Sequence, residues 1–302
     1  MFRYSQKIAS LGFILICLNM GACASTTTQQ QYSAPPPPKL VQPVTDQSRR
    51  VIGKIDWVEG RVYSYGSGHL RTPAPYTVTH GRDYALADAQ QSMLEVIRNL
   101  QVDANNKAST FFHYAVISRY INERVKQREI LEREQYSENN HQVTVSLPLL
   151  GNNGITKLLI PTVLENESQK SEPTGSAEWE QYDQSDIWPD NYSSLIIDAR
   201  GLDYRPALFA AIVDENGHSL YSLNKVDPNA AMFMLCEYTD SMNAALRSSR
   251  AGPTPLILQA LAPDHDPLIN VVLAKTEAQR LIAADARGRF LHDARVIVVI
   301  ND

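Results

Sequence analysis

Cysteine is scarce in this chain. Only three cysteines occur among 302 residues, and Cys17 and Cys23 both lie close to the N-terminus. The third, Cys236, therefore lacks a partner for an internal disulfide bond in the body of the protein. The fold has to be stabilised by its hydrophobic core, and we expect Cys236 to be a small buried side chain inside a helix over residues 229–247.

Long apolar runs are also missing. The most apolar uncharged segment, residues 8–18, measures roughly 16 Å as a helix at ~1.5 Å per residue, whereas the hydrocarbon core of a membrane is about 30 Å thick. We therefore expect no transmembrane helix. Arg3 and Lys7 precede this segment and small residues follow it. This order is typical of a secretory signal peptide, which we predict over residues 1–22.

The residues before Cys23 make this prediction more specific. Met20-Gly21-Ala22-Cys23 resembles the lipobox of bacterial lipoproteins, although methionine stands where leucine is more usual. We predict that Cys23 is the lipid attachment site. The alternative is ordinary cleavage after Ala22 or Ala24, which would leave the thiol free or remove it. By general lipoprotein rules, Ala24 rather than aspartate after the anchor favours the outer membrane over the inner membrane, with the body facing the periplasm.

A polar segment follows the predicted anchor. Residues 23–50 contain a run of four prolines and few apolar side chains. Such a segment buries too little surface to fold, and its prolines favour an extended chain. We predict a disordered tether that reaches up to roughly 80 Å at ~3 Å per residue.

The chain has no excess of basic residues. Lys and Arg number 28 against 33 Asp and Glu, a net charge of −5. Loss of Arg3 and Lys7 with the signal peptide leaves 26 against 33, or −7. A mildly acidic body lacks the basic footprint of nucleic-acid-binding proteins, so we expect no nucleic-acid partner.

The body divides into two predicted α+β domains, over residues 51–164 and 192–302. An acidic segment with Pro and Gly, residues 165–191, is the predicted linker between them. In the first domain we expect Gly66-Ser67-Gly68 and residues 71–76 to end a strand pair. Residue alternation and helical periodicity predict strands over 51–65 and 142–147 and helices over 82–100 and 108–131.

The second domain contains two especially clear patterns. Asn216-Gly217 between two short apolar runs predicts a hairpin with a type I′ turn. Residues 295–300 are apolar at almost every position, which predicts a central strand covered on both faces. The other predicted elements are strands over 195–197, 255–262 and 269–274 and helices over 229–247 and 276–290.

Known catalytic and metal-binding motifs are absent from the sequence. It has no glycine-rich phosphate loop, no G-x-S-x-G elbow, no C-x-x-C pair and no H-E-x-x-H helix. Asp264-His265-Asp266 is best explained as a charged turn. Glu132, Glu134 and Glu138 are best explained as a solvated cluster at a helix end. We therefore predict no catalytic residue, no metal site and no cofactor.

One constellation stands out against this background. Asp198-Ala199-Arg200-Gly201 follows the predicted strand over 195–197, and Arg205 lies close by. Either an ion pair of Asp198 with Arg200 or Arg205, or hydrogen bonds to backbone amides, would fix this corner. A binding role for Asp198, Arg200 and Arg205 is the alternative.

Several segments resemble a known family. Residues 53–62, the alanine-rich helix around Ala85-Leu86-Ala87-Asp88-Ala89 and the following Gln101-Val102-Asp103 resemble outer-membrane lipoproteins of the FlgP type and the N-terminal domain of FlgT. Residues 194–201 and 294–300 are similar to modules attached to such lipoproteins. The resemblance implies an envelope lipoprotein, with flagellar basal-body assemblies as the best-known context. The second domain is longer than in the smallest members, which leaves the flagellar role open.

These observations predict a non-catalytic envelope lipoprotein with a structural or assembly role. The expected partners are the outer membrane, through the lipid on Cys23, and other proteins of an envelope assembly. The alternative is a periplasm-facing binding module for a peptide or a cell-wall fragment, held in a groove between the two domains.

Overall fold

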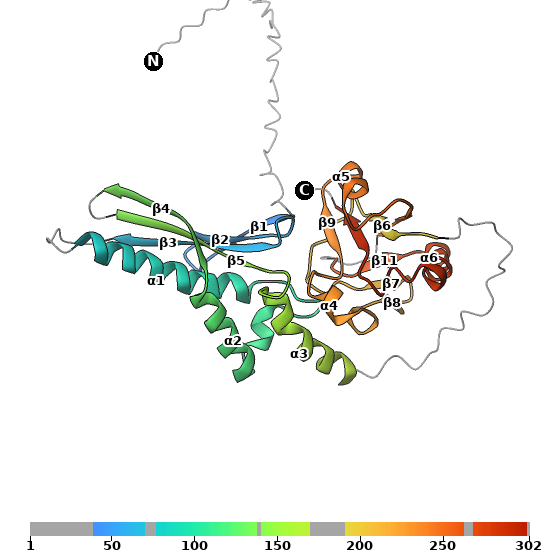
Figure 1. Ribbon diagram of the computed structural model, residues 1–302, viewed down its shortest axis with the longest axis horizontal. Coiled ribbons are helices and arrows are strands. Elements are labelled where there is room, and N and C mark those ends of the chain that lie inside the picture. The colour runs from blue at the N-terminus through green and yellow to red at the C-terminus, as the bar shows by residue number, and fades with distance from the viewer. Residues whose placement is uncertain (1–38, 70–76, 138–139, 170–190, 263–267, 301–302) are drawn as a thin grey trace, which may run out of the picture. The chain divides into compact units, whose positions relative to one another are not determined.

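Two domains of mixed helices and strands follow one another along the described chain (Figure 1). The structure is a computed structural model that describes residues 39–69, 77–137, 140–169, 191–262 and 268–300. Both domains combine small sheets with helices, which confirms the predicted α+β class. Within these described ranges, the structure contains no helix that is both long enough and apolar enough to cross a bilayer.

The first domain is built on an antiparallel sheet of five strands in the order β1-β2-β3-β5-β4. Side chains alternate between a covered and an uncovered face, as the two-residue period of a half-covered sheet requires. In β3, Val62 and Ser64 are buried, whereas Tyr63 and Tyr65 are half-buried. The strands are β1 (Val41–Thr45), β2 (Val51–Asp56), β3 (Arg61–His69), β4 (Glu129–Ser137) and β5 (Asn140–Pro148).

Helix α1 (Thr77–Arg98) covers one face of this sheet at very short range (Figure 1). A Cβ atom on Gly66 of β3 would lie 2.0 Å from the carbonyl oxygen of Ala85 and 2.4 Å from the amide nitrogen of Ala89. The predicted strand break at residues 66–68 is therefore wrong. The strand continues through the glycines, which are there because the helix backbone approaches too closely for a side chain.

The predicted helix over residues 108–131 is also wrong in its second half. The segment forms the short 3₁₀ helix η1 (Ala108–Phe111) and helix α2 (Ala115–Lys126). The chain then turns and enters strand β4. Buried residues recur at helical spacing only as far as Val125. Beyond it, pairing with β5 determines the structure, so Glu132 and Glu134 lie on a strand and not at a helix end.

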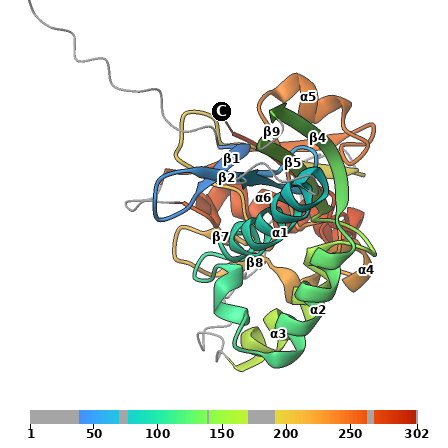
Figure 2. The same ribbon diagram turned by 90° about the vertical axis from the view of Figure 1, so that its left-hand side faces the viewer.

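The predicted tether and linker both extend into ordered structure. Strand β1 lies within the predicted tether, pairs with β2, and is anchored by the buried side chains of Leu40 and Val44. Helix α3 (Ile155–Gln169) runs into the predicted linker over 165–191. It packs beside α2 (Figure 2). Strand β1 is polar in composition, and two buried apolar residues are enough to hold it against the core. Helix α3 buries Ile155, Leu159, Ile160 and Val163, but Pro161 interrupts its helical pattern and its second half is polar.

The second domain is built on a parallel sheet of four strands in the order β10-β6-β12-β9. The prediction of a central strand near the end of the sequence is confirmed, because β12 lies between β6 and β9 and all four of its residues are buried. The strands are β6 (Ser194–Asp198), β9 (Glu237–Thr239), β10 (Pro255–Gln259) and β12 (Val296–Val299).

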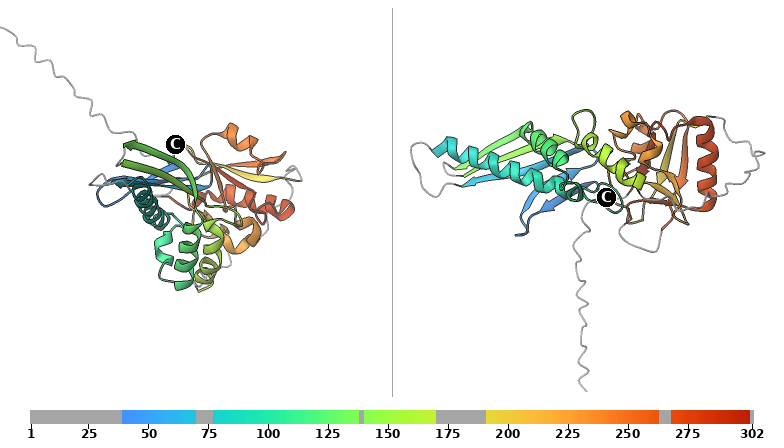
Figure 3. Two further views of the ribbon diagram at one scale, coloured as in Figure 1. Left: turned by 60° about the vertical axis from the view of Figure 1, so that its left-hand side comes forward. Right: turned by 90° about the horizontal axis from the view of Figure 1, so that it is seen from below.

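A second, smaller sheet completes this domain, in the order β11-β7-β8. Helix α6 (Lys275–Gly288) packs alongside β10, β11 and β7 (Figure 3). The strands are β7 (Ile212–Asp214), β8 (Ser219–Tyr221) and β11 (Val271–Leu273). The remaining helices are η2 (Leu223–Lys225), α4 (Pro228–Ala231) and α5 (Met242–Arg247).

Two predictions for this domain need correction. The predicted helix over 229–247 is divided into α4, β9 and α5, and Met234 between them has a positive φ of 69°, which no helix interior allows. The hairpin β7–β8 is present, but its turn is not type I′. Gly217 has a φ of 83°, whereas Asn216 is not among the described residues with positive φ. The Asp214 carboxylate instead accepts hydrogen bonds from the amides of Asn216 and His218.

The two domains share one continuous core. The described residues of both domains belong to a single compact unit, and their buried side chains belong to the same cluster. The amides of Leu208 and Phe209 donate to the carbonyl oxygens of Gln101 and Val102 at 3.1 and 2.8 Å. The rings of Trp57 and Tyr238 meet edge to face with centroids 6.1 Å apart. The residues Gln101-Val102-Asp103, singled out in the sequence, thus connect the first domain to the second.

Candidate functional site

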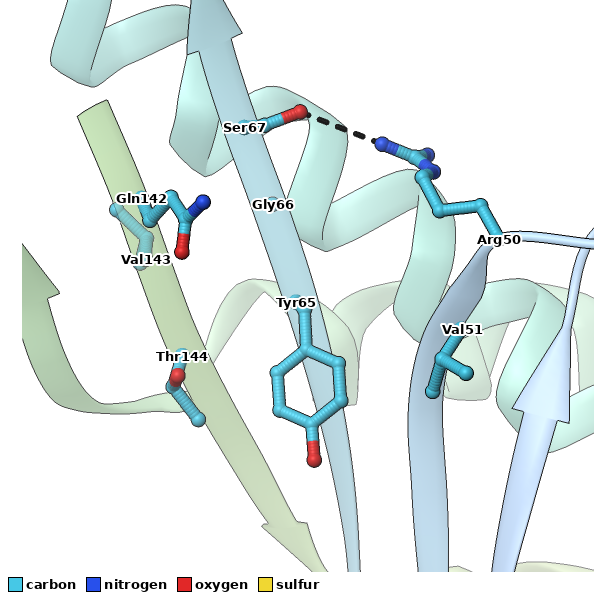
Figure 4. A pocket seen from close by; sticks show the side chains of 8 residues that line it. All are labelled: Arg50, Val51, Tyr65, Gly66, Ser67, Gln142, Val143 and Thr144. Carbon is cyan, nitrogen blue, oxygen red and sulfur yellow. Dashed lines mark hydrogen bonds between the residues drawn. The ribbon is translucent and has the colours of Figure 1, made fainter. Parts of the chain in front are cut away.

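The first domain carries a groove on the sheet face that α1 leaves uncovered (Figure 4). It has a volume of about 350 Å³, near the lower end of the roughly 300–1,000 Å³ of small-molecule pockets. Two directly opposed pairs form its floor, Tyr65 with Thr144 and Ser67 with Gln142. The lining residues are Arg50, Val51, Tyr65, Gly66, Ser67, Gln142, Val143 and Thr144.

The groove exists because strands β2 and β3 separate. Their residue-by-residue pairing runs from Asp56 with Arg61 to Gly53 with Ser64, while β3 continues to His69. Figure 4 shows β2 turning away from β3 at Val51, which lies across from Tyr65. The part of β3 beyond Ser64 therefore keeps β5 on one side and faces the groove on the other.

A charged network closes one end of this opening. The amide of Ser67 donates to the Asp88 carboxylate of α1 at 2.8 Å. Arg50 contacts the same carboxylate oxygen at 3.3 Å and donates to Asp46 at 3.2 Å. The hydrogen bond to Asp88 and the nearby carboxylates raise the pKa of Arg50. The pKa of Asp46 is lowered, chiefly by the hydroxyl of Ser48 and further by Arg50. One cation is thus compensated by two carboxylates.

The rest of the uncovered face is polar and aromatic. Lys54 Nζ lies 4.5 Å from the centre of the Tyr63 ring, within the range of a cation–π contact. The Tyr63 hydroxyl donates to Glu59, and partial burial together with that carboxylate raises the pKa of Tyr63 to about 12. Arg61 bridges Glu129 of β4 and the Ser146 hydroxyl of β5, each at 2.5 Å.

The predicted corner around Asp198 is an internal ion pair at the carboxyl end of β6. Arg200 donates from Nε at 2.8 Å and from Nη2 at 2.6 Å to the two oxygens of the Asp198 carboxylate. The Arg200 backbone amide donates to Oδ1 at 3.2 Å. These hydrogen bonds, the guanidinium first, lower the pKa of Asp198. The carboxylate is therefore already satisfied by its own loop.

Arg205 belongs to a separate contact. Its guanidinium lies 3.6 Å from Asp203, and the same carboxylate lies 3.3 Å from Lys39 Nζ. Lys39 also donates to the carbonyl oxygen of Leu202 at 2.9 Å. The corner thus holds the segment that leads into β1. This is a role in positioning the chain, in keeping with the structural alternative for Asp198, Arg200 and Arg205.

Cys236 is a fully buried thiol immediately before β9, and not in a helix as predicted. Burial raises its pKa to about 12, which keeps it protonated and unreactive. Burial also raises the pKa of Tyr221 and Tyr238 nearby, whose hydroxyls bond to the backbone at Leu235 and Ala207. These groups serve packing.

Some predicted residues lie outside the described part of the chain. These are Cys23 with its signal peptide, the tether up to residue 38, residues 71–76, Glu138, residues 170–190 of the linker and the segment Asp264-His265-Asp266. Among the residues that the structure describes, no group of three or more His, Cys, Asp or Glu side chains is arranged to hold a metal ion.

Comparison with known proteins concerns the second domain. Residues 194–302 match a family model described as the second domain of Treponema pallidum Tp0624. The match begins at the first residue of β6 and includes both sheets of this domain. A search of curated proteins found no match for the chain.

The groove was missed in the sequence, although its residues carried a signal. Tyr63, Tyr65 and Ser67 alternate with glycines and small residues, which marks one polar face and one face pressed against a helix. Gln142 and Thr144 alternate in the same way. The pairing that brings these two runs together depends on strand register, which no local pattern reveals.

Proposed function

We propose that this protein is a non-catalytic envelope lipoprotein, anchored by acyl chains on Cys23 to the outer membrane and facing the periplasm, which contributes a surface to a protein assembly. The lipobox-like Met20-Gly21-Ala22-Cys23 and the uncharged segment before it support the anchor. The uncovered face of the five-stranded sheet supports the assembly role, and it is the observation on which that role depends.

The face is a better candidate surface than the sheet edges. Pro43 in the outer strand β1 has no amide hydrogen to donate, and β4 on the other side begins with Glu129 and has two register shifts. Such features prevent strands of other chains from adding to an edge. The face instead presents Tyr63, Tyr65 and Arg61, residue types that are enriched at interfaces.

Two experiments test this proposal. Metabolic labelling with palmitate should label the wild type and not Cys23→Ser, and this substitution should move the protein from the membrane to the soluble fraction. A photo-crosslinking residue at Tyr63 should then capture envelope proteins that the same residue at Arg119, on the exposed side of α2, does not capture. If the wild type is not labelled, the proposed lipid anchor is wrong. If both positions capture the same proteins, the uncovered sheet face is not the assembly surface.

A flagellar context is part of the proposal only through the resemblance to FlgP and FlgT. The family match to Tp0624 covers residues 194–302 and says nothing about flagella. Deletion of the gene followed by motility and envelope-integrity assays separates the two contexts. Lost motility with an intact envelope would support the flagellar one.

The second candidate is a binding module for a peptide or a cell-wall fragment. The groove on the sheet face is the observation that favours it. Its location differs from the expected one between the domains, where backbone hydrogen bonds and a shared core join the two domains. Thermal-shift measurements with cell-wall fragments test it, because a ligand that binds the native state raises Tm.

A further inference from the structure

We propose that the groove between β2, β3 and β5 binds a neutral saccharide that carries N-acetyl groups. This inference rests on the second proposed function, a binding module, and names its ligand class. The groove has two chemically distinct ends (Figure 4). Tyr65 lies between Val51 and Thr144 at one end, and Gln142 and the Arg50–Ser67 hydrogen bond lie toward the other.

The charges around the groove disfavour an anionic ligand. Among the lining residues that the structure describes, Arg50 is the only charged one. Its guanidinium is paired with the carboxylates of Asp46 and Asp88. An anion would have to compete with two carboxylates that are already in contact. The remaining polar groups are the neutral hydroxyl and amide groups of Tyr65, Ser67, Gln142 and Thr144.

The backbone of the groove is not suited to an extended peptide. A peptide that adds to a sheet needs a continuous row of amides and carbonyls along the strand edge. On β3 the amide of Ser67 already donates to Asp88 at 2.8 Å. Arg50 reaches across the same position and donates to the Ser67 hydroxyl at 3.3 Å. An added strand would have to break this network, so recognition falls to the side chains.

The side chains match a sugar with an acetamido group. A carboxamide such as that of Gln142 offers both a donor and an acceptor, which an acetamido N–H and C=O complement. Gln142 is exposed, so its amide faces solvent before binding. The Tyr65 ring is half-buried on the same face and offers an aromatic surface, whose electron-rich face attracts the C–H groups of a pyranose. The directly opposed pairs Tyr65–Thr144 and Ser67–Gln142 place these two features one pleat apart.

The test uses the full chain with Cys23→Ser and the neutral probe N,N′,N″-triacetylchitotriose, followed by titration calorimetry and NMR. We expect saturable binding with a Kd of about 1 mM or tighter. Gln142→Ala and Tyr65→Ala should each weaken binding about fivefold, the effect of losing one hydrogen bond or one stacking contact. Gln142 is exposed, so its substitution leaves folding intact.

Tyr63→Ala is the matched control. Tyr63 lies on the same strand and the same face but outside the groove, and its hydroxyl is bonded to Glu59. Its removal should change the Kd less than twofold. If Tyr63→Ala and Tyr65→Ala weaken saccharide binding equally, the groove is not the binding site, because the effect would not be specific to the residues that line it.

Two further probes separate the ligand class from the function. Trigalacturonate is anionic and trialanine is a peptide. If trialanine shifts the NMR resonances of the groove residues and triacetylchitotriose does not, the proposed saccharide ligand is wrong. The proposal that the protein is a binding module would still hold. Tighter binding of trigalacturonate would overturn the neutral ligand. If no probe binds while Cys23 still directs the protein to the membrane, the inference fails and the lipid anchor is unaffected.

Discussion

The ammonium group of Lys39 lies 3.3 Å from the carboxylate of Asp203, so the segment that enters the first domain is held by the second. Lys39 also donates to the Leu202 carbonyl oxygen at 2.9 Å. This contact lies inside the predicted tether over residues 23–50, just before β1. The start of the described chain is therefore held by residues of the second domain.

Asp203→Ala should release this contact at small thermodynamic cost. The Asp203 side chain is 42% exposed, so we expect a loss of at most about 1 kcal/mol in the free energy of unfolding. Limited proteolysis should nevertheless cut near Lys39 faster in the variant than in the wild type. Asp293→Ala, which removes another exposed carboxylate, is the control. Unchanged cleavage in Asp203→Ala would show that β1 alone holds the segment.

Gly66→Ala should destabilise the first domain strongly. The new Cβ would lie 2.0 Å from the Ala85 carbonyl oxygen, so α1 has to move away from the sheet. We expect a loss of about 3 kcal/mol or more in urea unfolding. Gly201→Ala is the comparison, because it has a φ of 82° and no atom within 4 Å of its Cβ position. It should cost only about 1–2 kcal/mol from backbone strain. Equal effects would contradict the close helix approach.

Arg250→Ala should also destabilise the protein by about 2–4 kcal/mol. Its guanidinium donates to the carbonyl oxygens of Phe233 and Met234, in the segment before β9, and of Ala294, in the segment before β12. Arg250→Lys keeps the charge but loses the fork that reaches three carbonyls, so it should recover less than half of the loss. Arg247→Ala, on the exposed side of α5, should change stability by less than about 0.5 kcal/mol.

The ion pair of Asp198 predicts a specific pH dependence. The folded-state pKa of Asp198 is lowered by the Arg200 hydrogen bonds. Its stabilising contribution is therefore fully present above the unfolded pKa of about 3.9 and is lost as the pH falls through the folded value. Asp198→Asn should be less stable than the wild type at pH 7, and this difference should shrink below pH ~4. Unfolding curves at pH 7 and pH 3 check this, and a difference that stays constant would contradict it.

Sequence patterns predicted those helices and strands whose own residues carry a clear apolar pattern. Strand β12 has four consecutive buried residues, and α1 has an apolar stripe through Met93 and Ile97. Both were found because each carries enough apolar side chains to define its own environment. The hairpin β7–β8 was found for a similar reason, through its Asn216-Gly217 turn.

The missed elements depend on residues far away in the sequence. Strand β9 has three residues and exists because β12, almost sixty positions later, offers a partner. Strand β4 looks helical in isolation, but β5 pairs with it. Among the candidate site residues, the Asp198–Arg200 pair is local and visible, whereas the groove joins Tyr65 with Thr144, about eighty positions apart. Local propensity is overridden wherever such a partner is available.

Pro43 in the outer strand β1 acquires a different importance for copies that share one bilayer surface. Confinement by lipid would raise the local concentration of neighbouring copies far above that in free solution, much as a linker does. At that concentration, an outer strand with a full set of backbone donors could pair edge to edge with the outer strand of a neighbouring copy. Pro43 has no N–H to offer, so it would interrupt such a row of donors.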